Sequence, residues 1–370
     1  MDNIAFDAFW SYAHDDDDKS GGKVRQVAQA LEDEFSLVTG DDLQLFLDRK
    51  SLKWGDVWRE RVEEAIGEVP FFIPIITPKF LKSDECRREL VKFSGEAKSR
   101  GMDALLLPIL YIDVQGLTED NPDEVLALIA RTQYVDWTKF RLLDPSDSRV
   151  QQAVNDLALR IRDLKQEVTT TSLAIEGTSA TGELTELDET LAEIELRLPD
   201  WMKSVEFDPI AGKAWNAYRD ERAARVERLR SSNASRGAIY STWVKLGQEL
   251  LPIAQDRAEK AKTYARLSIE LDPLITKAIR LIKSHPERSA DLNPVRDGVN
   301  EAYLNIEPPE RIHDHGWNLP EYLRGANTHL EEAGLTMDES FKHSNEGNAV
   351  VGTWRDKLRE LDGDGLVIVR

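Results

Sequence analysis

The chain has 370 residues, and its 68 Asp and Glu against 48 Lys and Arg give a formal net charge of −20. This excess of acids argues against a general nucleic-acid binder and against docking on anionic membranes, since both need clustered Lys and Arg. Apolar residues make up 41% of the sequence, so the chain can form hydrophobic cores. Its length is typical of two domains, or three.

Other features of the sequence predict a cytoplasmic protein. No stretch approaches the ~20 consecutive apolar residues of a transmembrane helix. The first residues, Met1 to Asn3, lack the basic and apolar regions of a signal peptide. The single cysteine, Cys86, excludes an internal disulfide framework and a cysteine-based zinc knuckle.

Charge and composition divide the chain into three regions. Residues 166–198 hold eight acids and one base, with clusters of Thr, Ser and Gly, which predicts a solvated linker that becomes helical after Thr185. Residues 1–165 hold 22 bases and 32 acids, whereas residues 199–370 are close to balanced. We therefore expect a domain at 1–165, an acidic linker at 166–198 and a second domain at 199–370.

The first 165 residues alternate strand and helix patterns. Continuous apolar runs predict strands, and apolar residues spaced by three and four predict helices. Ser83 is the expected N-cap of one helix. The predicted strands are 4–10, 44–47, 71–76 and 104–112, and the predicted helices are 23–35, 58–66, 84–98 and 150–164. Such an order predicts a flavodoxin-like parallel sheet with helices on both faces.

An acidic run, Asp15 to Asp18, lies in the predicted loop 13–22. It lacks the Gly-Lys-Ser/Thr arrangement of a P-loop. We expect a solvated, flexible loop, whose four carboxylates would repel a phosphate-bearing ligand unless the loop folds away.

The remainder of the chain is predicted to be mainly helical. Pro252, Pro273 and Pro286 are expected to mark turns or kinks. Residues 286–320 are expected to be rich in loops and residues 366–369 to form a short strand. The predicted helices are 211–230, 235–256, 262–282, 320–333 and 350–361. This part has no Gly-rich phosphate loop, so the sequence does not indicate its ligand.

Three segments fall at predicted strand ends, the edge where ligands sit in open parallel sheets. The first ends in Ser11-Tyr12. The second reads Asp48-Arg49-x-x-Leu52-x-x-Gly55, and the third reads Ser83-x-x-Cys86-x-x-Glu89-Leu90. In this order and placement, they resemble the motifs of the TIR (Toll/interleukin-1 receptor) domain family, and their loops look like those of bacterial members. The resemblance covers residues 1–165 and says nothing of the rest.

The resemblance implies a catalytic role for Glu89, because many bacterial and plant TIR domains are NAD+ glycohydrolases whose Cys-x-x-Glu glutamate is catalytic. Cleaving the nicotinamide–ribose bond develops positive charge on the ribose, which one carboxylate can stabilise. Nicotinamide leaves without protonation, so no second carboxyl group is required. The alternative is that Glu89 is an ordinary exposed helix residue.

The sequence departs from the family at Glu85, where active members often carry an aromatic residue. A carboxylate there cannot stack on nicotinamide or adenine, and it could raise the pKa of Glu89 by repulsion. Trp54, Trp10 or Tyr12 could supply the missing aromatic surface.

Six further residues are candidates for substrate binding. Arg49 and Lys53 could attract the pyrophosphate with Trp54 as a lid; alternatively, their loop is a solvated basic turn. Ser11 and Tyr12 are expected to line the ribose side, although Tyr12 could simply pack. Cys86 is expected to be a packed motif residue rather than a nucleophile, since only His14 in this domain could pair with it.

No metal site or resident cofactor is expected, and NAD+ would be the substrate. The histidines His313, His315, His329 and His343 are interpreted as polar surface, and residues 362–365 as a turn too short for a calcium loop.

Three functions remain open. The leading hypothesis is an NAD+-cleaving antiphage effector, in which the TIR domains self-associate and an unidentified partner or trigger acts on the second domain. The alternatives are a non-enzymatic TIR scaffold and an enzyme that makes a cyclic nucleotide signal from NAD+.

Overall fold

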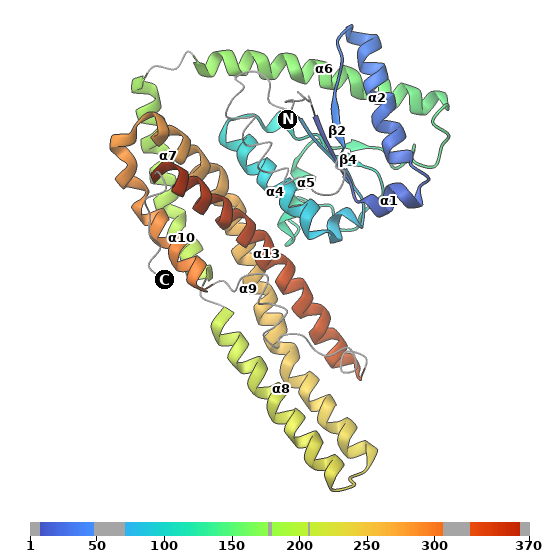
Figure 1. Ribbon diagram of the computed structural model, residues 1–370, viewed down its shortest axis with the longest axis vertical. Coiled ribbons are helices and arrows are strands. Elements are labelled where there is room, and N and C mark those ends of the chain that lie inside the picture. The colour runs from blue at the N-terminus through green and yellow to red at the C-terminus, as the bar shows by residue number, and fades with distance from the viewer. Residues whose placement is uncertain (1–7, 48–70, 177–179, 206–207, 306–325, 363–370) are drawn as a thin grey trace. The chain divides into compact units, whose positions relative to one another are not determined.

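The computed structural model describes residues 8–47, 71–176, 180–205, 208–305 and 326–362 (Figure 1). The chain divides into two compact units, Met1–Leu187 and Asp188–Arg370. The segment expected to be a linker, 166–198, contains the end of one long helix and most of the next.

The first unit is built on a five-stranded sheet in the order β2-β1-β3-β4-β5, in which all neighbouring strands are parallel. The strands are β1 Ala8–Ser11, β2 Leu45–Leu47, β3 Phe71–Ile76, β4 Ile109–Leu110 and β5 Val135–Asp136. Consecutive parallel strands need crossover connections, and helices supply those that the structure describes. The predicted parallel α/β fold is therefore confirmed.

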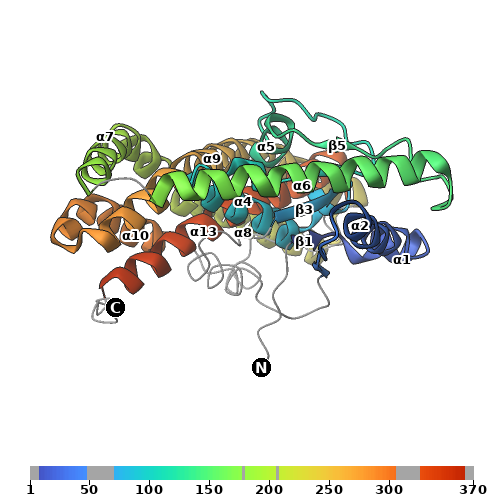
Figure 2. The same cartoon turned by 90° about the horizontal axis from the view of Figure 1, so that it is seen from above.

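Five described helices belong to this sheet: α1 His14–Lys19, α2 Lys23–Thr39, α4 Asp84–Ser99, α5 Glu124–Arg131 and α6 Ser148–Glu176. Helices α2 and α6 pack against each other, as Figure 2 shows. Helix α4 packs on the sheet through Phe93, whose ring stacks on Phe72 of β3 with centroids 5.0 Å apart. The Phe72 ring in turn stacks on Phe9 of β1 at 5.5 Å, so aromatic contacts fix α4 against the two central strands.

Several predicted elements agree with the structure, and one is much shorter. The predicted strand 71–76 coincides with β3, and Ser83 caps α4 by accepting a hydrogen bond from the Cys86 N–H. The run 104–112 forms only the two-residue strand β4, preceded by a 3-10 turn at Asp103–Leu105. Pro108 has no N–H to donate to the ladder, which limits the strand. The predicted helix 58–66 lies outside the described residues.

The second unit is helical. Its helices are α7 Ala180–Ser204, which begins in the first unit, then α8 Asp208–Ser231, α9 Arg236–Ser284, α10 Asn293–Asn305 and α13 Thr328–Asp362. Its core cluster combines Trp215 of α8 with residues of α9 and α13: Leu246, Leu250, Ala254, Leu330, Ala333 and Met337. Three helices therefore share one apolar core.

Two expectations for this unit were wrong in part. Pro286 follows the end of α9 as expected, but the helix continues through Pro252 and Pro273 without a turn. Each proline costs helix stability, and the extensive packing of α9 against α8 and α13 offsets that cost. Part of the expected loop region is also helical, with a 3-10 segment at Pro286–Leu292 followed by α10. The predicted terminal strand lies outside the described residues.

Helices α9 and α13 approach closely at Gly347. A Cβ added there would lie 2.7 Å from Cδ1 of Tyr264 and overlap the rest of its ring. Tyr264 is 1% exposed, and its hydroxyl donates to Oδ1 of Asn348 at 3.1 Å, so the ring has little room to shift. Gly352, on the same helix, has no atom within 4 Å of an added Cβ.

We expect these two glycines to respond oppositely to alanine. Gly347→Ala gains helix propensity of about 1 kcal/mol but overpacks the interface at a cost of ~1–3 kcal/mol, so the helical unit should lose stability. Gly352→Ala should gain up to ~1 kcal/mol. Urea unfolding followed by circular dichroism at 222 nm measures both. Equal effects of the two changes would contradict the close approach.

Candidate functional site

Ser11 and Glu89 meet at the carboxyl edge of the sheet. Ser11 is the last residue of β1, and Glu89 lies in the second turn of α4, whose first turn is fixed by the Ser83 cap. The Ser11 hydroxyl donates to Oε2 of Glu89 at 3.1 Å. Ser11 is 2% exposed, while Glu89 is half-buried. The fold thus places a carboxylate, oriented by a buried hydroxyl, where ligands bind in sheets of this kind.

A buried ion pair anchors the helix that carries Glu89. Arg87 is 0% exposed, and its guanidinium contacts Oδ1 of Asp123 at 2.7 Å. Asp123 is also the N-cap of α5, where its carboxylate accepts hydrogen bonds from the N–H groups of Val125 and Leu126. The pair joins the first turns of α4 and α5, so it fixes the position of α4 beside β3.

Cys86 and Tyr12 flank this pair of residues. Cys86 is a buried free thiol, 8% exposed, one helical turn before Glu89. Tyr12 is 7% exposed, and its ring meets that of His14 edge-on, with centroids 5.2 Å apart. Most of the surface of both side chains is therefore covered by neighbouring residues.

A cavity of about 960 Å³ adjoins Tyr12, beside β2 and α2. Its described lining residues are Tyr12, His14, Asp17, Asp18, Arg25, Gln29, Glu32, Leu45, Phe46 and Leu47. Burial raises the pKa of Glu32, an effect that the hydrogen bond from the Leu45 N–H opposes. Ser11 and Glu89 are not among the described lining residues, although Ser11 directly precedes Tyr12 in the chain.

The acidic run is folded, not a flexible loop, so that expectation was wrong. Residues His14–Lys19 form α1, and Asp17 is 2% exposed. Asp17 pairs with Arg25, accepting also from the Arg25 backbone N–H at 3.1 Å, and this contact raises the pKa of Arg25.

The other acids of α1 reach the end of β3. Asp15 pairs with Lys79, whose hydrogen bond and charge lower the pKa of the Asp15 carboxyl. Asp16 accepts a hydrogen bond from the Thr77 hydroxyl. These contacts tie α1 to the segment between β3 and α4. Two of the four acids, Asp15 and Asp17, are thereby paired with cations, which reduces the repulsion expected for a phosphate-bearing ligand.

The remaining sequence candidates are separate from this site or outside the described residues. Arg49, Lys53 and Trp54 lie outside them, as do His313 and His315. Glu85 is exposed one turn before Glu89. Trp10 is 0% exposed, so it cannot supply the missing aromatic surface. Within the described residues, no group of three or more His, Cys, Asp or Glu could hold a metal ion, and no helix is long and apolar enough to span a membrane.

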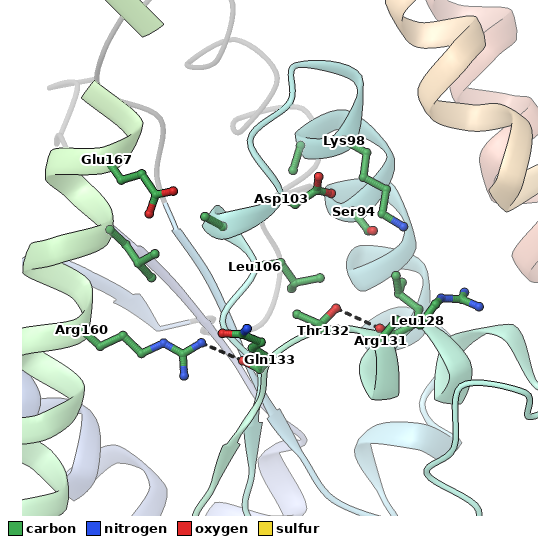
Figure 3. Close-up of a pocket in the computed structure, with 13 residues that line it drawn as sticks. Ser94, Lys98, Asp103, Leu106, Leu128, Arg131, Thr132, Gln133, Arg160 and Glu167 are labelled. Atoms are coloured by element: carbon green, nitrogen blue, oxygen red, sulfur yellow. Dashed lines mark hydrogen bonds between the residues drawn. The ribbon is translucent and has the colours of Figure 1, made fainter. Parts of the chain in front are cut away.

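A second cavity, of about 520 Å³, lies at the amino edge of the sheet (Figure 3). Lys98 of α4 and Arg160 of α6 line it, together with Gln133, whose carbonyl accepts from Arg160 at 2.9 Å. Burial lowers the pKa of Lys98 and of Arg160. Lys98 is nine residues beyond Glu89, or about 13 Å along the helix. This cavity is therefore distinct from the Ser11–Glu89 site.

The sequence predicted Ser11 and Glu89 as separate site residues, but not the hydrogen bond between their side chains. It also gave no indication that Arg25, Thr77 and Lys79 contact the acidic run. The available signal was the carboxyl-edge position of Thr77 and Lys79 after the apolar run 71–76. Nothing in the spacing indicated Arg25.

Comparison with protein families supports the resemblance of this domain to the TIR domain family. The family model described as TIR domain matches residues 9–154. No curated protein and no solved structure matches the chain. The match spans β1 to the first turns of α6 and includes both Ser11 and Glu89. With the five-stranded parallel sheet and its flanking helices, it shows that residues 9–154 of this chain form a TIR domain.

Proposed function

We propose that the TIR domain cleaves NAD+ between nicotinamide and ribose, with Glu89 as the catalytic residue. The observation that carries this proposal is the Ser11–Glu89 hydrogen bond at the carboxyl edge of the sheet. It holds a half-buried carboxylate at the position where the family resemblance puts the catalytic glutamate.

The chemistry requires one stabilising anion. As the bond from ribose C1′ to the nicotinamide nitrogen breaks, its electron pair leaves with nicotinamide and positive charge develops on the ribose. The Glu89 carboxylate, fixed by Ser11, stabilises that charge. Water then adds to C1′ and loses a proton, giving ADP-ribose; attack by a ring nitrogen of the adenine would give a cyclic product instead.

Binding of the phosphates requires cations beyond those around α1. The cavity next to Tyr12 is lined by Asp17, Asp18 and Glu32, and its Arg25 is paired with Asp17. Arg49 and Lys53, which precede Trp54, are proposed to supply the phosphate contacts. Tyr12 is proposed to face the ribose, and Cys86 to pack beneath Glu89 as a motif residue.

The test is NAD+ consumption by the purified full chain over a range of protein concentrations, with products separated by liquid chromatography and mass spectrometry. We expect nicotinamide and ADP-ribose, with activity per molecule rising with concentration if self-association completes the site. A cyclic product would favour the signal-generating alternative. No NAD+ loss at any concentration would contradict the proposal.

We further propose that this activity depletes NAD+ in an antiphage response in the cytoplasm, with the helical unit sensing a trigger or partner. The alternative of a non-enzymatic scaffold is favoured by one observation, the exposed carboxylate of Glu85 in place of an aromatic residue. In that case, charge reversal at Arg49 or Lys53 would break assembly while NAD+ stayed constant.

Ser11→Ala should weaken catalysis without abolishing it. A hydrogen bond to a charged group contributes ~1.5–3 kcal/mol, so kcat/KM for NAD+ should fall about 10- to 100-fold. Steady-state kinetics on the full chain measures this. Ser11→Thr keeps the hydroxyl and should retain more activity than Ser11→Ala. Wild-type rates in Ser11→Ala would show that this contact does not position Glu89.

A further inference from the structure

The helical unit carries a local excess of positive charge that the whole-chain value hides. Between Glu227 and Glu249 there is no acidic residue, whereas a chain with 68 acids in 370 residues would on average hold about four in such a stretch. The same stretch holds four cations, Arg228, Arg230, Arg236 and Lys245, and Arg225 lies just before it. We call these five residues the basic hairpin.

All five cations of the basic hairpin are exposed. None of them forms an ion pair or side-chain hydrogen bond with any residue in the part of the chain that the structure describes. Other cations of the same helices are paired: Arg222 with Glu249, Lys260 with Asp256, and Arg266 with Glu270. The five cations have one acid, Glu227, among them, so the group is net positive, and this favours binding of an anionic partner.

The basic hairpin has a defined geometry. Helices α8 and α9 pack side by side and are joined by the short connection 232–235 (Figure 1). Arg225, Arg228 and Arg230 follow one another along the end of α8 at about 3 to 5 Å of axial rise, with Arg228 and Arg230 on opposite sides of the helix. Arg236 begins α9, so these four cations surround the same end of the hairpin, while Lys245 lies ~13 Å further along α9.

The chemistry of the surface favours phosphate. Four of the five cations are arginines, whose planar guanidinium groups bind phosphate oxygens in a bidentate manner. The connection adds the exposed side-chain amide of Asn233, a group that commonly donates to nucleic-acid backbones. Tyr240, 54% exposed, lies one helical turn after Arg236 and offers a ring on which an unpaired base can stack.

From this geometry we propose that the basic hairpin binds the phosphate backbone of nucleic acid, without sequence preference. The whole-chain charge of −20 predicted no such partner. However, the phosphates meet the local surface at short range, because more distant charges are screened within a Debye length of about 8 Å at physiological salt. The inference does not depend on the proposed NAD+ cleavage.

The test is fluorescence anisotropy of the full chain with a labelled 20-nucleotide single strand and the corresponding duplex, at 50 to 200 mM salt. Four phosphate contacts should raise the Kd for the single strand about 50-fold across this range. Arg228→Gln with Arg230→Gln removes two contacts and should reduce that change to about 7-fold. Arg228→Lys with Arg230→Lys should retain most of the salt dependence.

The matched control is Lys260→Gln with Arg266→Gln, which removes two charges from exposed, paired positions on α9 and should leave the wild-type salt dependence. Circular dichroism checks that each variant is folded. Absence of binding to both oligonucleotides at 50 mM salt would overturn the proposal. A control variant that loses as much salt dependence of the Kd as Arg228→Gln with Arg230→Gln would also overturn it. Competition by polyglutamate as effective as that by an oligonucleotide of equal charge would indicate an acidic protein partner instead, and would also overturn it.

Discussion

Replacing Glu89 by glutamine is expected to lower kcat for NAD+ cleavage about 100- to 1000-fold, the effect of removing one group that stabilises charge in the transition state. Glutamine keeps the size of the side chain, and its amide oxygen can still accept from the Ser11 hydroxyl. Because the lost interaction is strongest in the transition state, kcat should fall much more than KM changes. Nicotinamide release, followed by chromatography, measures both constants.

Glu85→Gln is the matched control. Glu85 is exposed on the same helix, one turn before Glu89, and its replacement removes the same charge. If catalysis depends on the carboxylate that Ser11 holds, this variant should stay within about threefold of the wild type. Equal losses in the two variants would indicate a general charge effect, and wild-type activity in Glu89→Gln would show that Glu89 is not catalytic.

The largest expected effect on stability follows from replacing Arg87 by methionine. Removing one member of a fully buried ion pair costs ~3–5 kcal/mol, and we expect the lower end of this range because the remaining charge is 17% exposed and keeps its hydrogen bonds to a helix N-terminus. Here that charge is the carboxylate of Asp123, which also caps α5. Hydrogen exchange of the amides in β1 and β3, read by mass spectrometry, reports unfolding of this domain independently of the helical unit.

Two further variants test whether the ion pair between Arg87 and Asp123 stabilises the domain. Arg88→Met changes an exposed neighbour and should shift the unfolding free energy by less than about 0.5 kcal/mol. Combining Arg87→Met with Asp123→Asn should recover part of the loss, since asparagine still caps the helix and carries no charge. A loss below about 1 kcal/mol in Arg87→Met would show that the ion pair does not anchor α4.

The sheet of the TIR domain was predictable because its signals are local. The apolar run 71–76 became β3 without change, and Ser83 took the N-cap position of α4 that its residue type favours. The strand β5 was not predicted, since its two residues are too few for a period-2 pattern. Helix α5, which has 8 residues, was not predicted either.

The helical unit shows the opposite case, in which tertiary packing overrode local preference. Pro252 and Pro273 predicted turns or kinks, yet α9 runs for 49 residues through both. The sequence Arg225-Val226-Glu227-Arg228 interleaves basic and acidic residues. In the fold, Arg225 and Arg228 have no ion-pair partner among the described residues, because pairing depends on which residues share a face and which helix lies opposite.

Apart from α1, α5 and β5, the sequence by itself determined the order of the described strands and helices in the TIR domain. It also determined the position of Glu89 in its motif and the uneven distribution of charge, since these follow from periodicity and residue type. Only the tertiary structure decided that the hydroxyl of Ser11 lies 3.1 Å from Glu89, that Asp17 meets Arg25, and that Arg87 is buried against Asp123. These contacts join residues that are 78, 8 and 36 positions apart. Spacing along the chain does not encode them, because they form only when the strands and helices pack.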